Sequence, residues 1–206
     1  MAITLRPATV GTDDDAAIDI AIKNWLLTPK LVSAERLLPE PLMKTRRSRQ
    51  NQAALNPGSW LFLVAVDEEG KVVGHLDGGP AQAHDDELKD LGMDLDNTVE
   101  LLTIHVHPDY NRMGIGSMLT DAFFDWVPTG MAARRLHKRL TANAETPEML
   151  AQDHPSTCEV IIWTWKHNTK SIPFYTKRGG HLFLHSKLFY LGTDVEVICF
   201  KWTVPV

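Results

Sequence analysis

The chain has 206 residues, of which 44% are hydrophobic and 23% are charged, and this composition fits one soluble domain, residues 1–206, with a sizeable core. Its net charge of −5 argues against a nucleic-acid-binding surface and mildly favours a cationic partner. The N-terminus lacks the apolar core of a signal peptide, and no apolar run approaches membrane length. We therefore expect a cytoplasmic protein that has neither a nucleic-acid nor a membrane partner.

The first third of the chain predicts one strand followed by helices. Ile3 to Arg6 has the pattern of a strand, and Asp13 to Asp15 would cap a helix that runs through Leu27. A second helical stretch covers roughly Ser33 to Leu55, and the prolines at positions 39 and 41 are expected to divide it into two pieces. This second stretch carries a basic cluster that we interpret as a solvated helix face in preference to a phosphate contact; its members are Lys44, Arg46, Arg47 and Arg49.

Two strands and an acidic segment come next. Trp60 to Val66 and Lys71 to Leu76 predict strands joined by a turn, and Gly78 to Pro80 are expected to end the second strand. The acidic residues between 84 and 97 favour a solvated loop or a short helix. Because this segment leads into the strand that bears Glu100, a contribution to a pocket that attracts ammonium groups is the alternative.

Residues 100–126 predict a strand, a glycine-containing turn and a helix in succession. The strand ends before Pro108, and the helix is expected to stop at Pro128 and Gly130. The first amides of a helix have no partner within it and carry the positive end of its dipole, and glycine lets an anion approach them. This arrangement predicts a phosphate site, to which Arg112 would add a mobile positive charge.

The remaining segments predict an insertion, a buried strand, a short helix and two closing strands. Residues 128–157 exceed what such a connection needs and are a lid, a dimer contact or a disordered insertion. Glu159 to Trp165 is a strand buried on both faces, after which Ser171 would cap a helix with Pro173 in its first turn. Two antiparallel strands then follow, at 182–191 and 195–204. The two cysteines, at positions 158 and 199, are expected to be buried thiols.

The glycine-containing turn excludes two common nucleotide motifs. The dinucleotide fingerprint needs a small residue where Leu119 stands, and the P-loop needs a Gly-Lys-Ser/Thr triplet that the sequence lacks. The pattern that remains is Val-x-Pro-x-Tyr-x-x-x-Gly-x-Gly, formed by Val106, Pro108, Tyr110, Gly114 and Gly116. It resembles the acetyl-CoA signature of the GNAT superfamily of N-acetyltransferases.

A second segment resembles the same family. Its matching positions are Asn168, Ser171, Phe174, Tyr175 and Gly179, which fall at the spacing of the family's second signature. The resemblance is specific over residues 98–126 and 158–181 and architectural elsewhere. It implies an α/β (α+β) fold with a mixed, mostly antiparallel sheet of about six or seven strands, flanked by helices, whose two central strands splay apart to admit pantetheine.

The resemblance also assigns residues to acetyl-CoA, the expected co-substrate. Backbone groups of Ile104, His105 and Val106 would pair with pantetheine, and Asn168, Ser171 and Phe174 would meet the other side of the cofactor. The pyrophosphate would bind the amides of Asn111, Arg112, Met113, Gly114, Ile115, Gly116 and Ser117. The family usually has Gln or Arg at the position of Asn111, so pyrophosphate binding would depend more on Arg112. It usually has Phe at the position of Gly180, so the glycine would leave space near the sheet.

The chemistry is attack of an amine on the acetyl thioester. Only about one part in a thousand of a lysine-like ammonium is neutral near pH 7.4, so a base must remove a proton. Glu100 stands six residues before Val106, where some family members carry their base; a solvent-facing carboxylate is the alternative. Tyr175 stands where the family carries the tyrosine that protonates the departing thiolate, and a packing role is the alternative.

Two histidines of the central strand offer further possibilities. His105 and His107 alternate along the strand, but no convincing third ligand is near in sequence, so we expect no metal. If the strand is bulged, His105 becomes a rival base, because a bulge changes which side chains face the cleft.

The sequence therefore predicts an N-acetyltransferase that moves an acetyl group from acetyl-CoA to a primary amine of a small molecule by direct attack in a ternary complex. A protein or peptide amine is the alternative acceptor, and a non-catalytic CoA-binding module is the alternative outside enzymes. A homodimer is left open, as are the acceptor and the role of residues 128–157.

Overall fold

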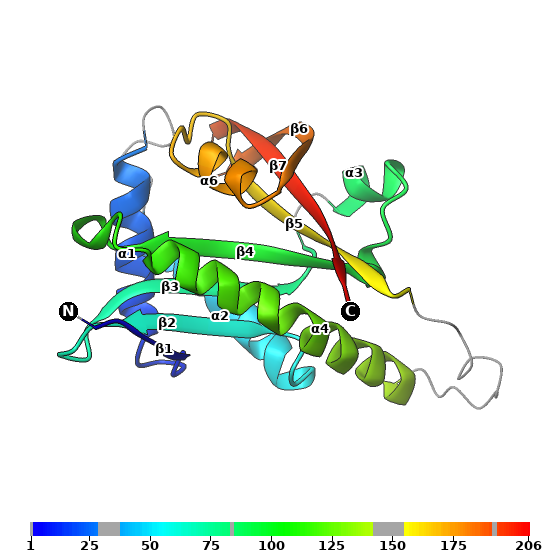
Figure 1. The fold of residues 1–206 in the computed structure, drawn as a ribbon, viewed down its shortest axis with the longest axis horizontal. Coiled ribbons are helices and arrows are strands. Elements are labelled where there is room, and N and C mark those ends of the chain that lie inside the picture. The colour runs from blue at the N-terminus through cyan, green and yellow to red at the C-terminus, as the bar shows by residue number, and fades with distance from the viewer. Residues whose placement is uncertain (1, 29–37, 83–84, 142–154, 191–192) are drawn as a thin grey trace.

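The core of the fold is a seven-stranded sheet in a computed structural model that describes residues 2–28, 38–82, 85–141, 155–190 and 193–206 (Figure 1). The strand order is β1-β2-β3-β4-β5-β7-β6, and every neighbouring pair is antiparallel except the parallel pair of β4 and β5. The predicted mixed, mostly antiparallel sheet is confirmed. The strands are β1 (Thr4–Pro7), β2 (Leu61–Val66), β3 (Val72–Pro80), β4 (Thr98–Val106), β5 (Thr157–Trp165), β6 (His181–Tyr190) and β7 (Thr193–Pro205).

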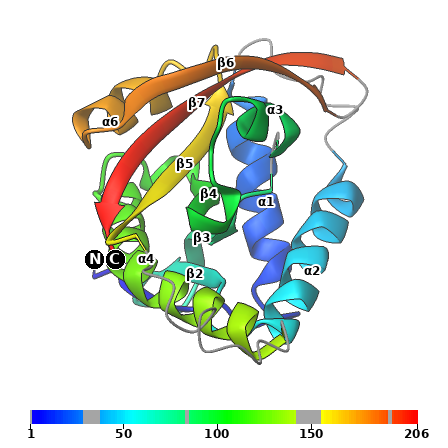
Figure 2. The ribbon, with the colours of Figure 1, turned by 90° about the vertical axis from the view of Figure 1, so that its right-hand side faces the viewer.

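Helices cover both faces of this sheet. Helices α1 and α2 lie on one face and α4 lies on the other, which is plain when the molecule is viewed from the side (Figure 2). Among the described helices, none combines the length and the apolarity that a membrane-spanning segment needs. The helical elements are α1 (Asp14–Leu26), α2 (Pro39–Leu55), α3 (Asp85–Asp90), α4 (Ile115–Thr141) and α6 (Ser171–Lys177), with 3₁₀ turns η2 (Leu95–Asn97) and η3 (Pro108–Tyr110).

The main core lies between α4 and the sheet. On α4, Ile115, Leu119 and Phe123 are almost fully buried, and they pack against buried strand residues that include Leu76 and Leu101. The strand residues alternate, as an amphipathic sheet requires, so that the next side chains along β3 point to the face covered by α1 and α2. The two cysteines, 158 and 199, are free and buried, as predicted.

Strand β4 contains a bulge that reverses this alternation. Asp77 of β3 pairs with Thr103 and Gly78 pairs with Leu101, so Leu102 has no partner of its own on β3. A bulge of one residue moves all later side chains of the strand to the opposite face. This irregularity decides which side chains of β4 meet on the α1–α2 face.

Strands β4 and β5 pair over only a short distance. Their parallel register joins residues 98–100 to residues 159–161, and beyond that point β5 continues along β7 while β4 continues along β3. The two ribbons diverge toward their carboxyl ends (Figure 1). The predicted splay between the central strands is therefore present, and it opens next to the C-terminal half of β4.

The prediction that Pro128 and Gly130 stop the central helix is wrong. Helix α4 runs without a break to Thr141, with Pro128 inside it. Proline removes one backbone hydrogen bond, but Val127 and Met131 on either side are buried in the core. Arg134 then donates to the carbonyl oxygens of Thr98 and Leu95, both at 2.8 Å. Tertiary contacts thus outweigh the local cost of the proline.

The long helix α4 accounts for much of the predicted insertion at 128–157. Its C-terminal half takes up the first part, and β5 begins at Thr157; residues 142–154 lie outside the described residues. The first part is an ordered helix, so a disordered insertion is wrong for residues 128–141, whereas a lid and a dimer contact stay predictions.

Three further expectations change in the structure. Strand β3 continues through Gly78 and Gly79 to Pro80 instead of ending before them. The two glycines leave room for the rings of Phe123 and Trp60, which pack directly on the strand where a Cβ would otherwise stand. Helix α2 begins at Pro39 with proline in its first turn, and the piece expected before it lies outside the described residues. Ser171 is the first residue of α6 and not its cap; the Asn168 side-chain oxygen accepts from the Ser171 amide at 3.3 Å.

The space expected beside Gly180 is filled. A Cβ at Gly180 would lie 2.3 Å from the indole of Trp202, and the Trp202 Nε1 donates to the Arg178 carbonyl oxygen at 3.0 Å. The large side chain that the resemblance predicted at position 180 is thus replaced by an aromatic ring from β7.

Candidate active site

A cavity of about 200 Å³ lies between the sheet and the α1–α2 layer, at the place where β4 and β5 part. Strands on both sides of the divergence contribute to its walls, together with α1 and α2. Much of its lining is apolar and includes Trp25 and Trp165, whose rings meet edge to face at 6.3 Å between centroids. Its polar lining comprises Thr45, Arg46, Arg49, His75, Asp77, Glu100, Thr103, His105 and Thr164.

Glu100 is buried in the wall of this cavity. Only 3% of the residue is exposed, and its Oε2 accepts a hydrogen bond from the Gln82 backbone amide at 2.8 Å. It pairs with Ile161 at the last position where β4 and β5 are joined. The alternative of a solvent-facing carboxylate is wrong, and the carboxylate lies where an acceptor entering the cavity would meet the opening between the strands.

The bulge in β4 places His105 on the same face as Glu100. Five residues separate the two, so a regular strand would direct them to opposite faces. After the bulge, Thr103 and His105 line the cavity with Glu100, while Ile104 and Val106 pack toward the core on the α4 side. The bulge that would make His105 a rival base is therefore present.

His105 and His75 form a neutral pair at the cavity. Their rings lie 5.3 Å apart between centroids. Burial lowers the pKa of His75 to about 3, helped by the positive charges of Arg46 and Arg49. Burial, with His75 nearby, also lowers the pKa of His105 to about 3. An imidazole with so low a pKa is a weak proton acceptor near neutral pH, which favours a carboxylate for that task.

This histidine pair predicts that stability falls as the pH is lowered from 7 to 5. The unfolded chain binds protons at these histidines below about pH 6.5, whereas the folded protein does so only near pH 3, so the stability they contribute is complete above 6.5 and lost below it. We expect a loss of about 2 kcal/mol per histidine at pH 5, measured by urea unfolding. His105→Gln should reduce this slope, whereas the exposed His185, changed to Gln, should leave it unaltered; equal slopes in all three proteins would contradict the prediction.

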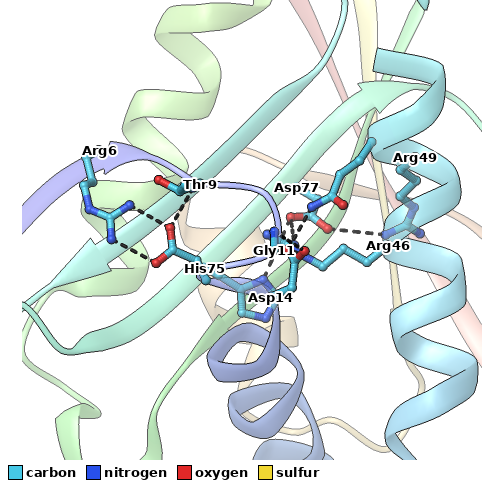
Figure 3. A network of polar contacts seen from close by, with 10 residues as sticks. Arg6, Thr9, Gly11, Asp14, Arg46, Arg49, His75 and Asp77 are labelled. Atoms are coloured by element: carbon cyan, nitrogen blue, oxygen red, sulfur yellow. Dashed lines mark hydrogen bonds and ion pairs between the residues drawn. The ribbon is translucent and has the colours of Figure 1, made fainter. Parts of the chain in front are cut away.

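A buried ion network borders the cavity and corrects the interpretation of the basic cluster. Arg46 is 2% exposed and reaches from α2 to Asp14 at the start of α1 and to Asp77 of β3 (Figure 3). Its Nε donates to Asp14 at 2.7 Å, its Nη1 donates to Asp77, and the Gln50 amide also donates to Asp14, at 2.8 Å. Lys44 and Arg47 are exposed, so the prediction of a solvated helix face is confirmed for these two residues and wrong for Arg46.

The charges in this network stabilise one another. Burial alone would raise the pKa of Asp14, but hydrogen bonds from Arg46, the Gly11 amide and Gln50 bring it below its usual value. Burial opposes the charge of Arg46, yet Asp77 and Asp14 raise its pKa. This network was not predicted from the sequence. One signal was available, because Leu42, Arg46 and Gln50 recur every four residues and therefore share the buried face of α2.

The predicted pyrophosphate loop lies between η3 and α4 at the other side of the opening. Arg112 and Gly114 both have positive φ values, 67° and 82°, and Asn111 to Gly114 are exposed. The loop is anchored at its start, because Tyr110 Oη donates to Asp67 at 2.8 Å. It leads into the first turn of α4, whose amides at residues 115–117 precede the first bond of the helix, from Met118 N to Gly114 O.

Helix α6 brings the second signature to this loop. A Cβ at Gly116 would lie 3.8 Å from Val106 and 3.9 Å from Phe174, so predicted cofactor residues from β4, α4 and α6 meet here. Arg178, just after α6, donates to Asp121 and to the Ser117 carbonyl oxygen, at 2.6 and 3.1 Å. These contacts hold α6 against α4 across the opening.

Two details of the predicted cofactor site depend on side chains that the sequence analysis did not identify. The Val106 carbonyl oxygen accepts from Asn24 of α1 at 2.8 Å, which occupies one of its two lone pairs. The Ser171 hydroxyl lies 2.8 Å from that of Thr164 on β5. Beyond Glu100, β4 does not pair with β5, and this free edge fits a pantetheine arm. The open space at Gly114, where an added Cβ has no neighbour within 4 Å, fits a diphosphate.

Tyr175 lies in an aromatic cluster. Its ring contacts those of Phe174, Phe200 and Trp202, and burial raises its pKa above the ordinary value. The phenol therefore stays protonated throughout the neutral range and keeps a proton to donate. The packing expected as an alternative is present, and it also fixes the orientation of the ring.

The acidic segment does not line the cavity, and His75 and His105 are the histidines that do so among the described residues. The acidic segment forms α3 and η2, and Asp96 pairs with Arg134 and Lys138 of α4; none of the described residues between 84 and 97 lines the cavity. Within the described ranges, no three His, Cys, Asp or Glu side chains cluster closely enough to hold a metal ion. The His107 ring accepts from the Asp109 amide at 3.3 Å, in the turn after β4.

Comparison with known proteins agrees with this geometry. Residues 21–152 match the model of the acetyltransferase (GNAT) family. No curated protein sequence matches the chain. Among solved structures, yncA, a putative acetyltransferase from Salmonella typhimurium with its cofactor acetyl-CoA, superposes with a TM-score of 0.63 at 16% identity, covering 100% of this chain and 96% of that one.

Two further structures were solved with a cofactor. PaiA N-acetyltransferase from Thermoplasma acidophilum, in complex with coenzyme A, has a TM-score of 0.60 and 18% identity over 98% of this chain and 100% of its own. A phosphinothricin acetyltransferase from Sinorhizobium meliloti, in complex with acetyl-CoA, has a TM-score of 0.60 and 18% identity over 100% and 90%. The family match covers more than half of the sequence, and the chain belongs to the GNAT family of acetyltransferases, acyltransferases that use acetyl-CoA.

Proposed function

We propose that the protein acetylates the primary amine of a small molecule by direct transfer from acetyl-CoA in a ternary complex, in the cytoplasm. One observation carries the proposal: a cavity on the α1–α2 face, with Glu100 in its wall, adjoins the point where β4 and β5 part. The predicted pyrophosphate loop precedes α4, on the opposite face. An acceptor and a thioester that enter from the two faces would meet at the opening, which is the requirement for direct attack.

Glu100 in the cavity wall and Tyr175 on α6 divide the proton transfers between them. Acetyl-CoA supplies an activated acetyl group on a thiol that leaves readily. Glu100 takes the proton of the ammonium, directly or through a water, because it is the buried carboxylate nearest the end of the β4–β5 pairing. Tyr175 donates a proton or a hydrogen bond to the departing thiolate, and the low pKa of His105 makes it the weaker candidate base.

The first test measures binding and then turnover. Acetyl-CoA at millimolar concentration should raise the melting temperature, and a panel of small primary amines and short peptides should then be tested for release of the CoA thiol. Thiol release with small amines supports the proposal. Release with peptides alone would move the acceptor to proteins, and binding without release with any amine would indicate a CoA-binding module.

A glycine substitution tests the proposed pyrophosphate loop. We expect Gly114→Ala to weaken acetyl-CoA binding at least about tenfold, because a side chain at a φ of 82° strains the loop and displaces its amides. Gly92→Ala is a matched control, since Gly92 also has a positive φ, 76°, and open space around it. Both variants should lose similar stability. Titration calorimetry should find weaker binding only in Gly114→Ala, and equal affinities would contradict the assignment.

A further inference from the structure

Four residues of this cavity share an unusual feature: within the described part of the chain, each has a buried side-chain nitrogen or oxygen atom without a hydrogen-bond partner. Arg46 Nη2, Arg49 Nε, both ring nitrogens of His75 and Thr103 Oγ1 have no hydrogen-bond partner among the described residues. All four of these residues line the cavity. A buried polar atom without a partner destabilises the fold, so the concentration of such atoms in one place indicates a ligand that forms hydrogen bonds with them.

The guanidinium groups define the chemistry of that ligand. The Arg46 side chain is 3% exposed and remains charged, and its two neighbouring carboxylates occupy Nε and Nη1 but not Nη2. Arg49 adds a second positive charge; its Nη1 lies 3.7 Å from Asp77 Oδ2, which is longer than a hydrogen bond. Figure 3 shows both arginines reaching from α2 toward Asp77. Arginine donors in a buried site match a carboxylate or a similar oxyanion.

The remainder of the lining supplies the other two parts of such a ligand. Glu100 gives the wall a negative group where the strands part, which suits an ammonium. Trp25, Trp165 and Leu188 offer apolar surface. The cavity thus presents a cationic side, an anionic side and an apolar wall, and a simple amine would leave the cationic side unsatisfied.

We propose that the acceptor is an amino acid, a primary amine that also carries a carboxylate held by Arg46 and Arg49, with an apolar body against the tryptophans. This inference rests on the proposed function, since it names the class of acceptor for the same site. It assigns Arg49 a role in substrate specificity. Arg46 serves both the ion network and the carboxylate, so Arg49, which is less buried, is the better residue to change.

The test uses pairs of amines that differ only in the carboxylate: leucine with isopentylamine, phenylalanine with 2-phenylethylamine, and 4-aminobutanoate with propylamine. We expect kcat/KM to be roughly 10- to 100-fold higher for the acid of at least one pair. Arg49→Gln should abolish that preference through KM while leaving the matched amine unaffected, and Arg49→Lys should restore part of it. Arg47→Gln, at an exposed neighbouring position, should behave as the unmodified protein.

Binding measurements separate the failure of this inference from that of the proposed function. If amines react as well as or better than their acids, the inference is overturned and the proposed function stands. If nothing is acetylated, the proposed function fails, and melting temperatures of the CoA-saturated protein decide the inference. Stabilisation by the acids but not by the matched amines then supports it, and no stabilisation by any of the acids overturns it.

Discussion

Replacing Glu100 with glutamine is expected to lower kcat for amine acetylation by about 10²- to 10⁴-fold, the usual contribution of a general base. Glutamine keeps the shape of the side chain, and its oxygen can still accept the hydrogen bond from the Gln82 amide. It cannot accept a proton from an ammonium. Affinity for acetyl-CoA should therefore be unchanged while turnover collapses, which steady-state thiol release and titration calorimetry measure separately.

A neighbouring carboxylate provides the control for this experiment. Glu159 on β5 pairs with Thr98 of β4 and contacts Thr203, but it does not line the cavity. Glu159→Gln removes the same charge from the adjacent strand and should leave kcat near that of the unmodified protein. Normal turnover in Glu100→Gln would contradict the assignment of Glu100 as the base. His105 would then be the remaining candidate base, and His105→Gln would be expected to lose activity.

Replacing Arg46 with methionine is expected to lower the free energy of unfolding by about 3–5 kcal/mol, as when one partner of a buried ion pair is removed. Methionine fills much of the space, but Asp14 would be left buried without a compensating charge among the described residues, and Asp77 would keep only the longer contact with Arg49, at 3.7 Å. Urea unfolding followed by circular dichroism measures the loss. Arg47→Met, one position along α2 and exposed, should change stability very little.

The same network predicts a rescue. Neutralising the carboxylates together with the arginine, as Arg46→Met with Asp14→Asn and Asp77→Asn, removes the uncompensated charges and should recover a large part of the lost stability. A triple variant that is less stable than Arg46→Met alone would show that the carboxylates stabilise the fold through contacts other than those with Arg46, which would contradict the prediction.

Local patterns in the sequence were sufficient for most of the sheet. Apolar and β-branched runs with turn residues between them predicted all seven strands to within a few residues, except at the end of β3, because strand pairing follows the side-chain pattern. The turn before α4 and helix α6 were also predicted, since glycine, proline and asparagine have specific backbone preferences there. Helix α4 was predicted too short, because the buried residues after Pro128 and the contacts of Arg134 are tertiary.

The surroundings of the cavity were the part that local patterns did not reveal. Asp14, Arg46 and Asp77 are 31 or more residues apart where they meet, and a charged side chain is usually exposed, so Arg46 was assigned to solvent. The bulge at Leu102 likewise depends on pairing with β3. Position 100 was identified only through its spacing from Val106, and the structure was needed to show which side chains surround it.

The short pairing of β4 with β5 has a consequence for how the two substrates are coupled. The cavity takes its walls from both sides of that divergence, so a molecule inserted like an additional strand fixes the distance between the walls. Each ligand then binds a protein whose shape the other has selected, and thermodynamic reciprocity requires equal changes in their two affinities. With the binding sites proposed above, the acetyl donor and the acceptor would therefore each change the protein's affinity for the other, through the distance between the two halves of the sheet.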